Sequence, residues 1–105
     1  MPIKLGKYSF EGPFDGAKFL RDTKGIFVVL CKDFRDEAKF YILDVDESDM
    51  IRTCAMNHKN QVDWVKKSRE TGKLAIAVMY AEMMTKEERQ KAVNYVRDLF
   101  NAPGK

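Results

Sequence analysis

Two runs of β-branched and aromatic residues, at residues 26–31 and 40–45, stand out in the first half of the chain. The charged stretch of residues 32–39 separates them. Because both runs are mainly apolar and of strand length, the pattern predicts a hairpin of two buried strands joined by a solvated loop.

Two further segments predict strands before and after this hairpin. Residues 74–80 are apolar on both alternating faces, which is typical of the central strand of a sheet. Residues 8–11 alternate briefly and are followed by Gly12 and Pro13, so they predict a short strand that ends in a turn.

Helical spacing predicts an element on each side of the hairpin. Apolar residues recur every third position between residues 14 and 23, which favours a short helix that ends near Gly25. After the second strand, Ser48 is placed to cap a helix that begins near Asp49, whose negative charge suits a helix start. The apolar positions of this helix are Met50, Ile51, Cys54 and Ala55.

A polar break at residues 57–60 separates that helix from a second helical piece around residues 62–65, and Gly72 ends this region. The last helix begins at the capping box Thr85–Glu88, in which a hydroxyl and a carboxylate each satisfy a free backbone N–H. It is predicted to stop at residues 101–104, because a proline cannot continue a helix. Its apolar stripe consists of Ala92, Val93, Val96, Leu99 and Phe100.

The order of these elements predicts an α+β fold, with a small mixed β-sheet flanked by helices. The chain has 105 residues, and a folded chain of this size buries roughly 65% of the surface of its unfolded form, which is enough for one core. Charged residues make up 33% of the chain and the apolar runs are only strand-sized, so neither disorder nor a membrane span is indicated. We expect a single cytoplasmic domain over residues 1–105.

Two cysteines, Cys31 and Cys54, lie in apolar stretches, and no secretory leader is recognised before them. This pattern favours free thiols over a disulfide framework. Two cysteines and the single histidine do not complete a tetrahedral zinc site by themselves. Cys54 and His58 lie one helical turn apart and form a possible nucleophilic dyad, although a buried apolar cysteine is the simpler interpretation.

An acidic run follows the second predicted strand and offers candidate ligands for Mg²⁺ or Ca²⁺. It places Asp44, Asp46, Glu47 and Asp49 within six residues. It lacks the glycine and the glutamate that a calcium-binding EF-hand loop needs at its sixth and twelfth positions. A solvated acidic turn that favours the following helix start is the alternative interpretation.

A modest basic patch covers residues 58–73, although the whole chain carries 19 basic against 16 acidic residues, a net charge of +3. Cations and a stacking ring are the elements of single-stranded nucleic-acid recognition, and Trp64 is either that ring or part of the core. The candidate nucleic-acid-binding residues are Lys59, Trp64, Lys66, Lys67, Arg69 and Lys73.

Several short motifs, taken in order, resemble the GIY-YIG nuclease domain over residues 25–103. They are Gly25-Ile26-Phe27, the strand end Asp44-Val45-Asp46-Glu47-Ser48, a helix with Ile51 and His58, and a late helix closing in Asn101-Ala102-Pro103. The chain is most similar to a subgroup of small bacterial proteins in which the second motif reads Asp-Val-Gly-Glu-Ser, with Asp46 here in place of glycine.

The resemblance implies a site that this chain has largely lost. In active members two tyrosines, an arginine, a histidine and a metal-binding glutamate surround the scissile phosphate. Here Phe27 and Asp44 stand at the tyrosine positions, and Cys54 stands at the arginine position. His58 matches the histidine, whereas Val93 occupies the glutamate position. These replacements remove the charge and metal that normally stabilise the transition state.

A shifted alignment offers Tyr41, Arg52 and either Glu87 or Glu88 instead, but it breaks the motif spacing. We therefore expect a GIY-YIG-like domain that has lost nuclease activity, with no catalytic residues, metal or cofactor, and that acts as a binding or interaction module.

Two alternatives remain for this domain. One is a metal-dependent phosphodiesterase or nuclease with a site rebuilt from Asp44, Asp46, Glu47 and His58, in which the three carboxylates are the candidate ligands for Mg²⁺ or Mn²⁺. The other is a nucleic-acid-binding protein that uses residues 58–73. The expected partner is a nucleic acid or a protein, without a membrane, and the chain is expected to be a monomer or a homodimer.

Overall fold

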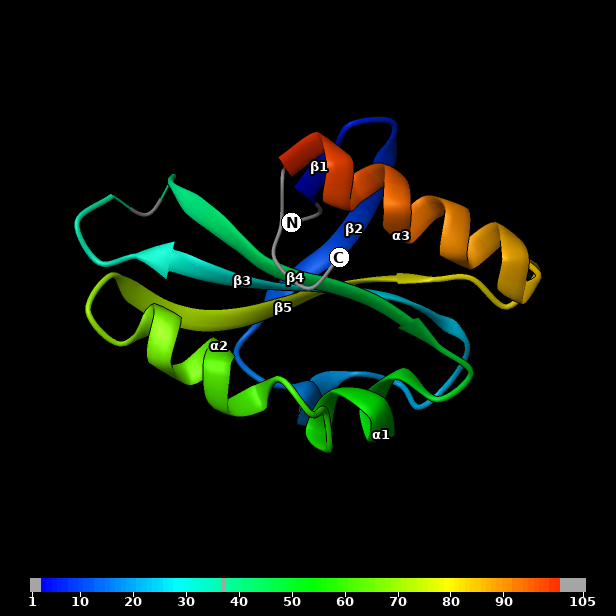
Figure 1. Ribbon diagram of the computed structural model, residues 1–105, viewed down its shortest axis with the longest axis horizontal. Helices are drawn as coiled ribbons and strands as arrows, with labels where there is room; N and C mark the ends of the chain where they lie inside the picture. The colour runs from blue at the N-terminus through cyan, green and yellow to red at the C-terminus, as the bar shows by residue number, and fades with distance from the viewer. Residues whose placement is uncertain (1–2, 37, 101–105) are drawn as a thin grey trace.

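A computed structural model describes residues 3–36 and 38–100 and has an α+β fold, with helices on both faces of one sheet (Figure 1). The strands are β1 (Ile3–Leu5), β2 (Tyr8–Phe14), β3 (Gly25–Asp33), β4 (Phe40–Ser48) and β5 (Gly72–Tyr80). The helices are the short 3-10 helix η1 (Ala17–Phe19), α1 (Ile51–Met56), α2 (Gln61–Ser68) and α3 (Lys86–Phe100).

The five strands lie in the order β1-β2-β5-β3-β4, which confirms both the β3–β4 hairpin and the central place of β5. The expectation of a mixed sheet was wrong, because every pairing within the described residues is antiparallel. Strands β4 and β5 do run in the same direction, but β3 pairs with both of them and separates them.

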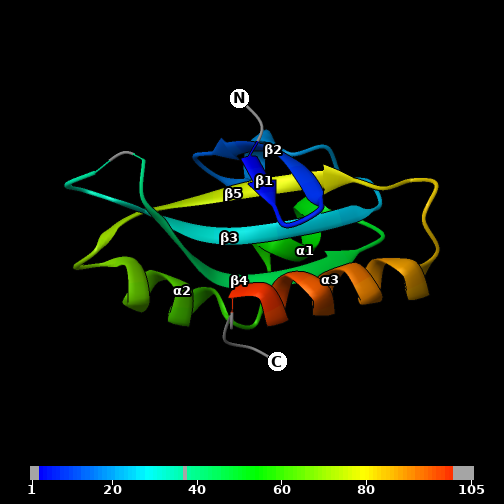
Figure 2. The same cartoon turned by 90° about the horizontal axis from the view of Figure 1, so that it is seen from above.

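Alternation along β3 divides the core into two layers. One layer lies between the sheet and α3, where Ile26, Val28 and Leu30 pack with Val93 and Val96 of the helix. Phe27, Val29 and Cys31 point to the opposite face, where Ile51, Ala55 and Trp64 of α1 and α2 cover the sheet. Figure 2 gives a second view of this layered arrangement. Both faces of β3 are apolar because helices bury each of them.

The beginning of the chain differs from its prediction. Strand β1 was not predicted from the sequence. It turns into β2 at Gly6, whose φ of 63° is a conformation that favours glycine. Strand β2 continues through Gly12 and Pro13, where its pairing with β5 shifts register between Glu11 and Phe14. A proline is tolerated there because the regular ladder is interrupted. The helix predicted over residues 14–23 is only the single turn η1.

The two predicted helix starts had different outcomes. The capping box of α3 is confirmed, since Thr85 and Glu88 exchange backbone-to-side-chain hydrogen bonds of 2.9 and 3.1 Å. The cap predicted at Ser48 was wrong, because α1 begins only at Ile51. The Ser48 hydroxyl accepts the backbone N–H of Met50, which precedes the helix. Asp22 serves α1 instead: it accepts hydrogen bonds from the backbone N–H and the hydroxyl of Thr53, which lower its pKa.

The remaining expectations concern the helix pair and the chain end. The polar break at residues 57–60 does separate α1 from α2, as predicted. The predicted stop of α3 at residues 101–104 lies outside the described residues. Within the part of the chain that is described, no helix has the length and apolar character needed to cross a membrane.

Candidate functional site

The outer edge of the sheet carries two aspartates that face the helix pair α1–α2. Strand β4 is an edge strand, and its register with β3 shifts between the Val29–Asp44 and Leu30–Ile42 pairs. This bulge leaves Leu43 as the extra residue, so that Leu43 and Asp44 both turn toward the α1–α2 layer. Asp46 lies two residues further on, opposite Phe27, and therefore faces the same layer.

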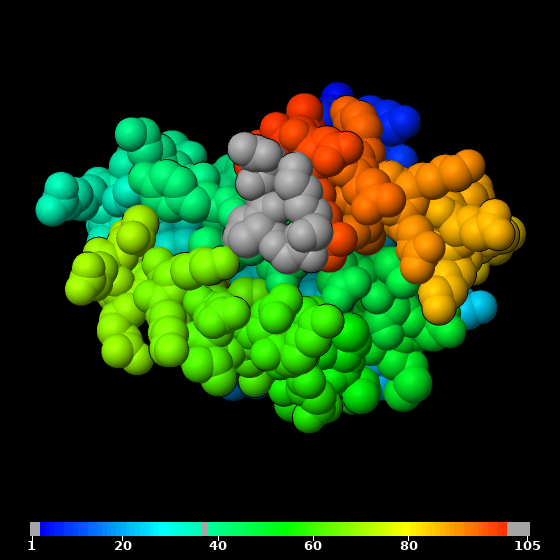
Figure 3. Space-filling view, viewed as in Figure 1, coloured from blue at the N-terminus to red at the C-terminus, as the bar shows by residue number. Residues whose placement is uncertain are grey.

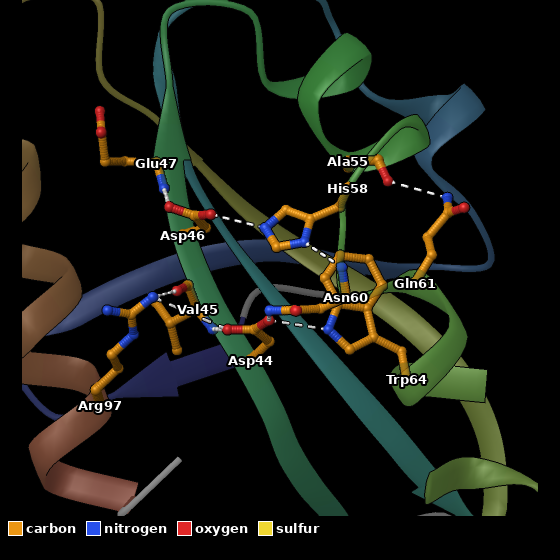
Figure 4. Close-up of polar contacts among 10 residues, drawn as sticks. All are labelled: Asp44, Val45, Asp46, Glu47, Ala55, His58, Asn60, Gln61, Trp64 and Arg97. Atoms are coloured by element: carbon orange, nitrogen blue, oxygen red, sulfur yellow. Dashed lines mark hydrogen bonds and ion pairs between the residues drawn. The ribbon is translucent and has the colours of Figure 1, made fainter. Parts of the chain in front are cut away.

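Asp44 is buried, with 2% of its surface exposed, and its carboxylate is fully engaged (Figure 4). Oδ1 accepts the backbone N–H of Val45 at 2.9 Å. Oδ2 accepts two side-chain donors from the helix pair, the Trp64 indole N–H at 2.9 Å and the Asn60 amide at 3.0 Å. The carboxylate thus joins the edge of β4 to the beginning of α2.

Asp46 repeats this arrangement one step along the strand. Its Oδ1 accepts the backbone N–H of Glu47 at 2.8 Å, and its Oδ2 lies 2.7 Å from His58 Nε2. The other ring nitrogen, Nδ1, accepts the backbone N–H of Asn60 at 3.1 Å. Because Nδ1 is an acceptor, the proton of a neutral His58 sits on Nε2 and is donated to Asp46. Neither ring nitrogen is left to exchange a proton with a substrate.

Arg97 of α3 reaches around the sheet edge to the same place. Its Nη2 donates to the carbonyl oxygen of Val45 at 2.7 Å and lies 4.0 Å from Asp44 Oδ1. Together with the two aspartates, Arg97 satisfies outward-facing backbone groups of the edge strand, which otherwise invite pairing with another strand. We call Asp44, Asp46, His58, Asn60, Trp64 and Arg97 the edge network.

The structure brings together four of the five positions that the family resemblance assigns. Phe27 lies edge-on to the His58 ring, with centroids 6.1 Å apart. Asp44 and Cys54 belong to the same layer of the molecule. Val93 does not join them, because it packs on the opposite face of the sheet, in the α3 layer.

The shifted alignment does not assemble a site. The Tyr41 hydroxyl donates to Asp33 Oδ2 at 2.9 Å, near the hairpin loop, and Glu88 serves the capping box of α3. Arg52 is exposed on α1 and Glu87 is exposed on the first turn of α3. The four residues therefore lie on three separate elements, β4, α1 and α3.

Cys54 is half-buried and is not activated as a nucleophile. Burial raises the pKa of its thiol, and the negative charges of Asp46 and Glu47 raise it further, whereas a hydrogen bond with Ser48 acts in the opposite direction. Because the thiolate is the nucleophile, a raised pKa lowers reactivity at neutral pH. Both ring nitrogens of His58 are occupied elsewhere, so the geometry does not assemble the Cys54–His58 dyad.

The acidic run is divided between the two faces of the sheet. Asp44 and Asp46 face α1 and α2, but Glu47 faces α3 and pairs with Arg89 Nε at 2.8 Å. Asp49 pairs with Arg89 Nη2 at 2.6 Å. The side chain of Arg89 is only 3% exposed, and its hydrogen bond with Glu47 raises its pKa. Among residues 3–36 and 38–100, no three His, Cys, Asp or Glu side chains form a group that fits a metal ion.

The basic patch loses its aromatic member. Trp64 is only 4% exposed, and its ring packs against His58 with centroids 4.7 Å apart. It belongs to the core, so it does not offer a face to a nucleic-acid base. The other candidates, Lys59, Lys66, Lys67, Arg69 and Lys73, are all exposed. Lys73 lies 3.7 Å from Asp15, which also pairs with Lys32 at the same distance.

An apolar cleft opens beside the edge network. It measures about 480 Å³ and lies between η1, the helix pair and β5. Its apolar walls include Val29, Trp64, Val65, Leu74 and Ile76, and its polar lining residues are Asp15, Lys18 and Gln61. Its volume and its mainly apolar lining are typical of ligand-binding clefts. Trp64 links the two features, because it forms a wall of the cleft and also donates to Asp44.

Comparisons with known protein families, curated proteins and solved structures gave no match. The function of the candidate site is therefore inferred from its geometry.

Sequence reasoning missed four residues of these networks: Asp22, Asn60, Arg89 and Arg97. Arg89 and Arg97 did carry a signal, because they lie on the helix turns that hold the apolar residues of α3. A charged residue on the buried side of a helix needs a partner. Asp22 and Asn60 lie in polar segments and gave no comparable signal.

Proposed function

We propose that this protein is a GIY-YIG-like binding module that does not cleave phosphodiesters and that holds its ligand in the apolar cleft. The order of hairpin, helix pair, strand and helix between β3 and α3 supports the domain type. The observation that carries the proposal is the contrast between two neighbouring features. The side chains of Asp44, Asp46, His58, Asn60 and Trp64 in the edge network hydrogen-bond one another, whereas the adjoining cleft of about 480 Å³ is open.

The closed state of the edge network argues against phosphate binding and cleavage. A phosphodiesterase needs groups that are free to hold the phosphate and to move protons. His58 has both ring nitrogens occupied, and Asp44 and Asp46 place two carboxylates where a phosphate would need attraction. At the same edge, Arg97 donates from Nη2 to the Val45 carbonyl oxygen and lies 4.0 Å from Asp44, although its buried Nε has no hydrogen-bond partner among the described residues.

We predict that the purified protein does not cut single-stranded, duplex or branched DNA in the presence of Mg²⁺ or Mn²⁺. Gel electrophoresis of end-labelled substrates measures this. The matched variants are His58→Ala, within the edge network, and Glu70→Ala, at an exposed position. Cleavage that persists in Glu70→Ala and disappears in His58→Ala would belong to this chain and would overturn the first half of the proposal.

We also predict that the cleft binds a neutral apolar probe. N-phenylnaphthylamine fluoresces in apolar surroundings, so titration should give a saturable increase in its emission. Val65 lines the cleft and is 47% exposed, and Val65→Asp should weaken binding about tenfold because the new carboxylate loses hydration when the probe binds.

The control for this titration is Val62→Asp on the same helix. Val62 is 64% exposed and does not line the cleft, so its substitution should change the affinity less than about twofold. Far-UV circular dichroism checks that both variants remain folded. An absence of saturable binding, or an equal loss in the two variants, would contradict the assignment of the cleft as the ligand site.

A further inference from the structure

A second hollow continues the apolar cleft across the outer side of α2. It measures about 240 Å³, and it shares Gln61 and Val65 with the cleft. Its other lining residues are Val62, Lys66 and Arg69. Val65 therefore stands between an apolar space on one side and two cationic side chains on the other. A ligand that fills both spaces needs an apolar part and an anionic part close together.

Large apolar side chains are exposed around both spaces. Val62 and Val65 of α2 are 64% and 47% exposed, and Met56 of α1 is 51% exposed. Each of the three lines the cleft or the hollow. Figure 3 shows α2 as part of the outer surface of the molecule. Apolar side chains that are exposed next to one another often mark a protein–protein interaction site, whereas singly scattered ones are normal on a protein surface.

Apart from Asp15, the charged side chains that line the cleft and the hollow are positive. Lys18 lines the cleft at one side, and Lys66 and Arg69 line the hollow. The acidic lining residue Asp15 is already paired with Lys32 and Lys73. The acidic residues of the α2 region, Asp63 and Glu70, line neither the cleft nor the hollow. The surface is thus complementary to negative charge that accompanies apolar groups.

Resting on the proposed function, we infer that the cleft and the hollow together bind an acidic segment of a partner protein that carries large apolar side chains. An apolar side chain of the segment enters the cleft beside Trp64 and Val65. Its carboxylates lie over Lys66 and Arg69. A nucleic acid fits less well, because its bases need an exposed stacking ring and Trp64 is only 4% exposed, with its ring against His58.

A random peptide library tests this inference without prior choice of a ligand. Fifteen-residue peptides displayed on yeast are sorted against the fluorescently labelled full-length protein, and the most enriched peptides are synthesised. We expect them to combine Asp or Glu with Leu, Ile, Phe or Trp, and their binding is then measured by fluorescence anisotropy.

Matched variants locate the binding site of the enriched peptides. Val65→Asp and the double variant Lys66→Glu/Arg69→Glu should each weaken binding about tenfold or more, because they remove the apolar wall or reverse the complementary charge. The double variant Lys59→Glu/Lys67→Glu makes the same change in charge at exposed positions outside both spaces. It should weaken binding less than about threefold.

The peptide selection itself would overturn the inference in three cases: enrichment no greater than with the Val65→Asp protein, enriched peptides without acidic and apolar residues, or equal losses in the two double variants. Tighter binding of a fifteen-nucleotide single strand than of any selected peptide would assign the surface to nucleic acid instead. Because the neutral probe reports on the cleft by itself, probe binding without peptide binding would refute this inference alone and leave the proposed function standing.

Discussion

Replacement of Asp44 by alanine is expected to lower the free energy of unfolding by about 3–5 kcal/mol. The carboxylate accepts the buried N–H groups of Val45 and Trp64 and the Asn60 amide. A buried donor left without an acceptor costs about 1–3 kcal/mol. Since a domain of this size has a net stability of about 5–15 kcal/mol, the loss should be a large fraction of the total.

Urea denaturation followed by far-UV circular dichroism measures this effect independently of the Trp64 environment. The control is Glu70→Ala, at an exposed position, which should stay within about 0.5 kcal/mol of the natural protein. Asp44→Asn keeps one acceptor oxygen and should be less damaging than Asp44→Ala. Equal stability of Asp44→Ala and Glu70→Ala would refute the structural role of the edge network.

The edge network gives the acidic run of the sequence a physical role. Asp44 and Asp46 each use one oxygen for an edge-strand N–H and the other for the α1–α2 segment. Arg97 takes the carbonyl oxygen between them. The run was interpreted either as a metal site or as a solvated turn, and the first two aspartates are instead acceptors at a buried sheet edge. Spacing alone did not distinguish these possibilities because it does not show burial.

Elements with strong local patterns could be predicted from the sequence. The runs at residues 26–31, 40–45 and 74–80 each lie within an observed strand, and the capping box of α3 forms as expected. The segment at residues 14–23 could not be predicted, because its three regularly spaced apolar residues do not hold the flanking Gly16 and Leu20 in a helical conformation, and both have extended backbones. The bonds of Leu20 and Phe19 to preceding carbonyl groups close only one turn.

The candidate site was harder to predict than the fold, because its contacts join residues distant in sequence. Asp44 meets Trp64 across 20 positions, and Glu47 meets Arg89 across 42 positions. Nothing in the local pattern around Trp64 decides between a stacking ring and a core residue, and the observed burial depends on the acceptor that Asp44 supplies. The apolar cleft had no sequence signal of its own, since its walls come from η1, both helices and two strands.

Arg89→Met is expected to lower the free energy of unfolding by about 3–5 kcal/mol, because it removes one partner of a buried ion pair. Arg89 is 3% exposed and Glu47 is 12% exposed, whereas Asp49 is 70% exposed. The substitution therefore leaves the Glu47 carboxylate without its cation in a poorly hydrated place. The loss of Asp49 as a partner matters much less, since water solvates that side chain.

A double-mutant cycle separates the unpaired charge from the lost packing of the Arg89 side chain. Glu47→Gln in the Arg89→Met background should recover about 1–3 kcal/mol, because the uncompensated charge is gone. The matched background control is Asp49→Asn, which should recover less than about 0.5 kcal/mol. Urea denaturation of the four proteins of the cycle gives the coupling energy directly. Additive effects of Arg89→Met and Glu47→Gln would show that the Arg89–Glu47 ion pair between α3 and β4 contributes only packing.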